Sequence, residues 1–81
     1  ALDKAVDTAK NAVRKDPTLA AAHFILGLAL SARGDMEDAK SAFTQCDELS
    51  PGFIASRKNW QPYRDPESNR RIKSAFEAVV N

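Results

Sequence analysis

The sequence is poor in the residues on which most enzymes and metal sites depend. It contains one Cys, one His and three Gly, and the glycines stand singly at positions 27, 34 and 52. A single Cys excludes an internal disulfide, and no His or Cys pair has the spacing of a metal site such as H-E-x-x-H or C-x-x-C. Isolated glycines do not build a phosphate-binding loop. We therefore expect no metal, no cofactor and no catalytic activity.

Long apolar runs and a strong charge are also missing. No run of about 18 apolar residues is present to span a membrane, and the N-terminus shows no secretory leader, so we expect a cytoplasmic protein. Residues 54–81 mix six Lys/Arg with three Asp/Glu, which is unlike the basic stripe of a nucleic-acid-binding domain. Because the chain lacks an initiator Met and begins within an expected helix, we expect a piece of a longer protein.

What the sequence does contain is apolar residues at helical spacing, separated by turn residues. Ala, Leu, Ile and Phe recur at i, i+3, i+4 and i+7, which predicts an all-α domain. Asp16-Pro17 and Asp65-Pro66 suit helix starts, with Asp as the cap and Pro at the first helical position. Gly34-Asp35 suits a tight turn between helices. The expected helices cover residues 2–15, about 18–32, about 36–49, a short segment from near 52 to about 59, and 66–80.

The helices over residues 18–32 and 36–49 carry the most informative pattern. Ala39, Phe43 and Cys46 lie on one face of the second helix, and we expect Gly27 on the first helix to approach Ala39 most closely. His23 and Cys46 both fall on inward faces, and a thiolate–imidazole pair is the one candidate for nucleophilic catalysis. A lone Cys among apolar neighbours is typical of a core residue, so we favour the core interpretation.

This pattern resembles the tetratricopeptide repeat, a helix–turn–helix unit of about 34 residues. A shift of 34 residues places Leu2, Ala5, Ala9 and Ala12 on Met36, Ala39, Phe43 and Cys46. Residues 1–17 are then expected to be half a repeat, residues 18–53 a complete repeat, and residues 54–81 a short helix, a loop and a capping helix. The matching residues are Leu26-Gly27, Leu30, Gly34-Asp35, Ala39, Phe43, Cys46, Leu49 and Pro51.

The resemblance implies a non-catalytic interaction module that binds a partner helix or peptide. The candidate contact residues are Phe24, Ile25 and Leu28 in the complete repeat, followed by Lys58 and Trp60. If the three apolar side chains are exposed, they form a groove for the partner; if the last helix covers them, the groove is filled. Trp60 has a second interpretation, in which it packs under the last helix.

Two further interpretations concern assembly. The face of the first helix that carries Leu2, Ala5, Ala9 and Ala12 lacks a partner helix within half a repeat. Either the longer parent protein supplies that helix upstream, or two copies cover each other in a homodimer. The segment Pro62–Glu67 also resembles the end of the repeat region in some bacterial class III adenylate cyclases and related signalling proteins. That resemblance implies a regulatory or dimerisation segment of a larger signalling enzyme.

Overall fold

The computed structural model describes residues 1–80, and within that range the chain is all-α, as the sequence predicts. Four α-helices and one short 3-10 helix follow one another without a strand in the described part. Their bounds are α1 (Leu2–Lys15), α2 (Ala20–Arg33), α3 (Met36–Leu49), η1 (Ala55–Arg57) and α4 (Pro66–Val80). None of these helices has the length and apolar character needed to cross a bilayer.

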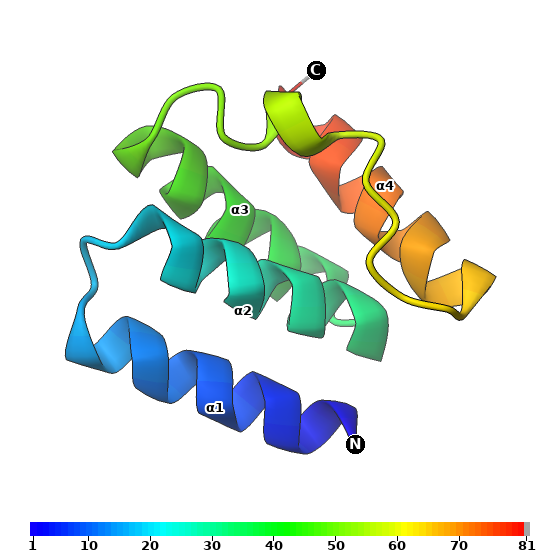
Figure 1. Cartoon of the computed structure of the whole chain (residues 1–81), viewed down its shortest axis with the longest axis horizontal. Coiled ribbons are helices and arrows are strands. Elements are labelled where there is room, and N and C mark those ends of the chain that lie inside the picture. Colours follow the sequence, from blue (N-terminus) through cyan, green and yellow to red (C-terminus); the bar gives the residue numbers. More distant parts are fainter. Residues whose placement is uncertain (81) are drawn as a thin grey trace.

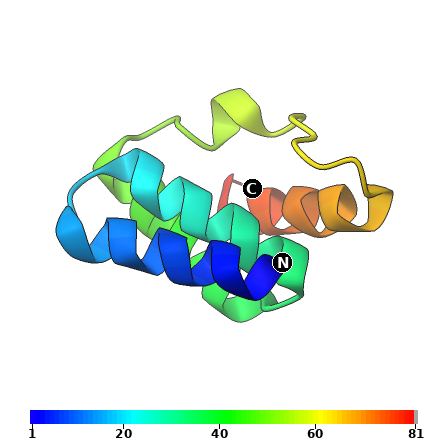
Figure 2. The ribbon, with the colours of Figure 1, turned by 60° about the horizontal axis from the view of Figure 1, so that its bottom comes forward.

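The second helix is the central element of the fold. It packs against α1, α3 and α4, and α3 also packs against α4. Figure 1 shows α2 between α1 and α3, running antiparallel to both, with α4 beyond α3. The connection between α3 and α4 contains η1 and passes along one side of the helices (Figure 2). An apolar α2 is suited to this place, because neighbours bury most of its surface.

The core is built around three phenylalanine rings from three helices. Phe43 of α3 and Phe76 of α4 meet edge to face, with their ring centroids 4.9 Å apart. Phe24 of α2 lies 5.9 Å from each of the other two centroids. Ile54 and Ile72 are fully buried around them. Aromatic pairs at these distances add to the stabilisation by burial, so this cluster ties α2, α3 and α4 together.

The turn between α2 and α3 follows the predicted chemistry. Gly34 has a φ of 97°, which is the left-handed conformation that glycine adopts without strain. The amide of Asp35 donates to the carbonyl of Leu30 over 2.9 Å, which closes the end of α2. Asp35 occupies the N-cap position of α3, but no hydrogen bond joins its side chain to the helix amides. Its carboxylate binds Arg33 instead, at 2.5 Å.

Several details differ from the prediction. The start of α2 was expected at Asp16-Pro17, but α2 begins at Ala20, and Asp16 instead caps the C-terminal end of α1. The carboxylate of Asp16 accepts hydrogen bonds from the amide and hydroxyl of Thr18. The short helix expected over 52–59 is reduced to the single turn η1. Two fully buried residues, Val6 and Ile54, lay outside the predicted apolar faces.

The residue of α3 that lies nearest to Gly27 also differs from the one expected. A methyl group added at Gly27 would lie 2.4 Å from the Cε1 atom of Phe43, and the three nearest atoms all belong to that ring. Gly27 therefore makes room for Phe43, whereas the sequence had placed Ala39 opposite it. The ring of Phe43 occupies this position because Gly27 has no side chain in the way.

The backbone carries a correspondence at the 34-residue spacing. Both α1 and α3 have 14 residues, and they begin at residues 2 and 36. Their C-caps have nearly equal dihedral angles, with φ −146° and ψ 85° at Asp16 and φ −142° and ψ 86° at Ser50. The correspondence does not extend to α2. The residues 34 positions after α2 contain the short helix η1 and no full α-helix.

Candidate functional site

The residues predicted to contact a partner do not form one surface. Phe24 and Leu28 are buried, and Phe76 of α4 stacks on Phe24. The last helix therefore fills the groove that these side chains would have offered, which was one of the two predicted outcomes. Ile25 lies elsewhere and is 55% exposed. Lys58 and Trp60 are exposed in the segment after η1.

Trp60 packs on α2 and not under α4. Its ring stacks on Phe24 at a centroid distance of 5.7 Å and an interplanar angle of 16°, yet 49% of Trp60 remains exposed. The two aromatic residues share a hollow of about 450 Å³ with Arg57 and Lys58. One face of the indole is therefore free beside two cations, which suits contact with an external group.

Ile25 belongs to a different hollow, which we call the α1 hollow. It has a volume of about 520 Å³ and lies along α1, with Ile25 contributed by α2. Its walls are almost entirely apolar, and every helical position of α1 within it is small apart from one Lys. The lining residues are Ala1, Lys4, Ala5, Thr8, Ala9, Ala12 and Ile25. Such a surface accepts large apolar side chains from outside.

His23 and Cys46 are not brought together as a reactive pair. The Nε2–H group of His23 donates to the carbonyl of Pro17 over 2.8 Å, so this nitrogen is occupied in holding the α1–α2 connection. Cys46 is fully buried, and its burial raises the pKa of the thiol to about 11. A thiol with that pKa is protonated at neutral pH and is a poor nucleophile. The predicted core position of Cys46 is therefore confirmed.

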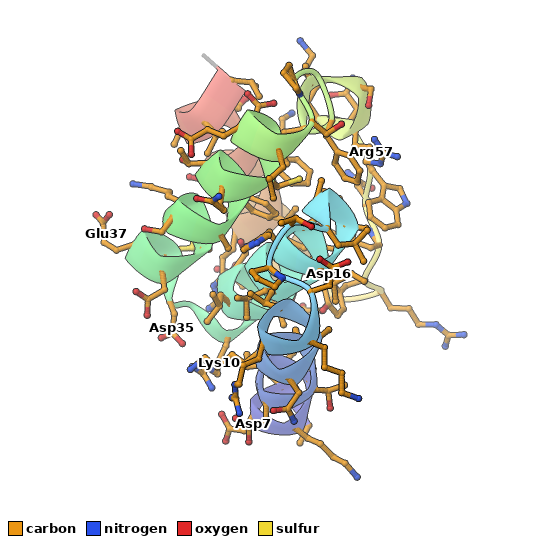
Figure 3. The ribbon with its side chains drawn as sticks, turned by 90° about the vertical axis from the view of Figure 1, so that its left-hand side faces the viewer. Asp7, Lys10, Asp16, Asp35, Glu37 and Arg57 are labelled. Atoms are coloured by element: carbon orange, nitrogen blue, oxygen red, sulfur yellow. The ribbon has the colours of Figure 1, made fainter. Side chains whose placement is uncertain are left out.

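Figure 3 shows Arg57 beside the aromatic rings, on the opposite side from Asp35 and Glu37. Arg33 bonds both Asp35 and Asp3, and the hydrogen bond with Asp35 raises the pKa of the guanidinium. Within residues 1–80, no three His, Cys, Asp or Glu side chains gather in a way that would hold a metal ion.

No protein family, no curated protein and no solved structure matches the chain. The case for a function therefore rests on the two surfaces described above, the α1 hollow and the surroundings of Trp60. Sequence reasoning had named Ile25, Lys58 and Trp60 but had not assigned the first to a separate surface. The sequence does contain the signal that separates Ile25 from Phe24. Ile25 follows Phe24 by one residue in the same helix and therefore faces about 100° away from it.

Proposed function

We propose that the chain is a non-catalytic interaction module that binds a helix of a partner protein in the α1 hollow. The observation that carries the proposal is the exposure of Ile25 at the edge of a hollow with apolar walls. A half-exposed Ile next to Ala5 and Ala12 leaves apolar area in contact with water. Covering that area is favourable by roughly 25 cal/mol for each Å² removed from water.

The 34-residue correspondence supports a helix as the occupant. In the proposed arrangement α1 is the second helix of a tetratricopeptide-like unit, α2 and α3 form the next unit, and α4 caps the end. α3 packs on the helix that precedes it, and by the same spacing the corresponding face of α1 would pack on a further helix. A repeat helix without its neighbour exposes the face that the neighbour would bury.

The size of the side chains indicates what that helix carries. In the pair α2–α3 the large residue is Phe43, which fills the space above Gly27. The position 34 residues before Phe43 is Ala9, and Ala5 and Ala12 on the same face are small as well. The large side chains must therefore come from the partner. We expect an amphipathic helix with Leu, Ile or Phe at positions i, i+4 and i+7.

A second copy of this chain fits the α1 hollow less well. Within residues 1–80, four large apolar residues are exposed by more than a third, and they lie on different segments: Leu19, Ile25, Leu49 and Trp60. None of them forms a pair at helical spacing that could enter the hollow of another copy. Two alanine faces pressed together would bury little apolar area, so we favour a partner helix over a homodimer. The homodimer is the competing outcome of the test.

The test uses a synthetic 18-residue amphipathic helix with Leu at i, i+4, i+7 and i+11 and a fluorescent label. Its binding to the whole chain is followed by fluorescence anisotropy. Ala12→Arg places a long charged side chain in the hollow and is expected to weaken binding by about tenfold or more, as the loss of a central contact does. Ala78→Arg is the matched control, since Ala78 is an exposed alanine on α4.

The parent and Ala78→Arg should bind equally well, and Ala5→Arg should behave like Ala12→Arg. Equal binding by all four proteins would contradict the proposal. Light scattering on the parent protein without peptide tests for the homodimer. If the parent is a dimer and Ala12→Arg is a monomer, the α1 hollow is a surface for self-association and not for a partner helix.

A further inference from the structure

A second surface with a different chemistry lies on another face of α2. The hollow that Phe24 and Trp60 share continues into two more hollows, which run past residues 58–61 and on to the start of α4. Lys58 and Trp60 line the first two, and Asn69 and Lys73 line the last two. We call this continuous surface the basic trough. The cations along it are Arg57, Lys58, Arg64, Arg70 and Lys73.

The trough is lined by cations and contains no carboxylate. None of the residues that form its three hollows is Asp or Glu. Two acidic groups at the start of α4 are engaged: Asp65 binds amides there, and Glu67 pairs with Arg70 and Arg71. Among residues 1–80, the other four cations of the trough have no ion pair. The trough therefore presents positive charge that the fold itself does not neutralise.

Local contacts hold the trough in shape. The guanidinium of Arg57 lies over the ring of Phe53, with its Cζ atom 3.9 Å from the ring centroid, and it donates to the carbonyl of Phe53 over 3.0 Å. Asn69 fixes the connecting segment to α4 through two hydrogen bonds with the backbone of Tyr63, of 3.0 and 2.6 Å. A surface arranged before binding loses less conformational entropy when a ligand arrives.

We propose that the basic trough binds an extended acidic peptide segment that places one apolar side chain on the free face of Trp60. The carboxylates of the segment lie along Lys58, Arg64 and Lys73, where opposite charge favours binding and orients the chain. The indole supplies an apolar anchor of the kind that dominates peptide interfaces. This inference is independent of the α1 hollow, which is apolar and lies along a different helix.

The shape of the trough favours a peptide over other anions. A small ligand is normally enclosed over most of its surface, whereas three shallow hollows in a row suit an extended chain. Proteins that bind single-stranded nucleic acid stack successive bases on several aromatic residues. Here Trp60 is the one exposed aromatic ring in the described part of the chain, because Tyr63 is partly buried and held by Asn69.

The experiment uses the only Trp in the sequence as its reporter. The probe is an eight-residue peptide of Glu and Ser with one central Leu, acetylated and amidated so that its ends carry no charge. Addition of the probe is expected to change the fluorescence of Trp60, and the affinity should fall as salt is raised, because exposed charge pairs are screened. The same peptide with Lys in place of Glu should leave the fluorescence unchanged.

Matched variants locate the binding site. Lys58→Gln combined with Lys73→Gln is expected to weaken binding by about tenfold, as the loss of two charge contacts does. Lys10→Gln combined with Lys15→Gln lowers the net charge equally at exposed positions of α1 and should leave the affinity within about twofold. Trp60→Ala, followed by anisotropy of a labelled probe, should also lose about tenfold through the missing anchor. Circular dichroism confirms that each variant remains helical.

Three results would overturn the proposal. The Lys peptide could bind as well as the Glu peptide, which would remove the role of charge. The two lysine pairs could have equal effects, which would place the acidic peptide outside the trough. An oligothymidine of eight nucleotides could bind more tightly than the peptide and compete with it, which would assign the trough to nucleic acid. None of these results depends on whether the α1 hollow binds a helix.

Discussion

At the scale of single residues, the contact between Gly27 and Phe43 shapes how α2 packs on α3. Phe43 is fully buried, and its ring occupies the space that a side chain at position 27 would need. Glycine within a helix normally costs about 1 kcal/mol relative to alanine. Here that cost is offset, because the missing Cβ allows α2 and α3 to enclose an aromatic ring.

Replacement of Gly27 by Ala is therefore expected to destabilise the protein by about 1–3 kcal/mol, despite the better helix propensity of alanine. The new methyl group would collide with the ring, and neighbouring side chains leave the ring no room to move. Urea denaturation followed by circular dichroism measures the change in the free energy of unfolding.

The mechanism can be tested by a second substitution, Phe43→Leu, which removes part of the ring and makes room for the methyl group. The two substitutions together should cost less than the sum of their separate costs, with a coupling of about 0.5–3 kcal/mol. Additive costs would show that the collision is not the cause.

At the scale of elements, the start of α4 shows how one side chain sets a helix boundary. The carboxylate of Asp65 accepts hydrogen bonds from the amides of Glu67 and Ser68, each over 3.3 Å, and from the hydroxyl of Ser68 over 2.9 Å. The bond from the Ser68 hydroxyl is the main reason that the pKa of Asp65 lies below its ordinary value of 3.8. Proline at the first helical position adds a fixed φ, so the sequence was sufficient to place this boundary.

Asp65 is expected to make the stability of the protein depend on pH. Because its pKa is lower in the folded state, its charge stabilises the fold above 3.8 and this contribution is lost as the pH falls through the folded-state value. Asp65→Asn keeps a good cap without the charge, so its melting temperature should lie below that of the parent near neutral pH and approach it in acid.

The control for this prediction is Asp65→Ala, which removes both the charge and the cap. Its melting temperature should be the lowest of the three proteins at neutral pH and should stay below that of Asp65→Asn in acid. A constant difference between the parent and Asp65→Asn at every pH would contradict the assigned role of the carboxylate.

The sequence predicted a longer helix than the three-residue η1 that the structure contains. The segment begins after Gly52, whose φ of 89° is incompatible with a helical start at that residue. Ile54 alone is buried in the stretch from Ile54 to Asn59, so no second apolar side chain anchors a longer helix. Short helices are stabilised mainly by burial of an apolar stripe. With one anchor, the chain forms a single turn and continues as the wall of the basic trough.

At the scale of the whole molecule, the phenylalanine cluster joins α2, α3 and α4 in one core. The ring of Trp60 stacks on Phe24, so the fluorescence of Trp60 reports on the same cluster that joins the helices. We expect unfolding followed by Trp60 fluorescence and by circular dichroism to show coincident transitions, as in a two-state domain.

Phe76→Ala should shift both transitions together and lower the free energy of unfolding by about 3–5 kcal/mol, through lost burial and the cavity that remains. Glu77→Ala is the neighbouring control, because Glu77 is exposed on the same helix, and it should leave both transitions in place. Loss of the fluorescence signal before the helical signal would show that the loop and α4 unfold separately from α2 and α3.

The sequence by itself determined the elements that depend on local chemistry. The period of the apolar residues placed α1, α3 and α4, Gly34 ended α2, and the Asp65-Pro66 pair started α4, because each of these signals acts within a few residues. The same local reasoning placed Cys46 in the core, since its neighbours at helical spacing are apolar.

Only the tertiary structure decided which faces remained free. Whether Phe24 and Leu28 were open depended on where α4 packs, and that position is set by contacts between residues far apart in the sequence. The pairing of Gly27 with Phe43, the burial of Ile54, and the joining of Lys58 with Lys73 across the loop have the same origin. A one-dimensional pattern gives the face of a helix, but the neighbour that covers it is chosen by the shape of the packed chain.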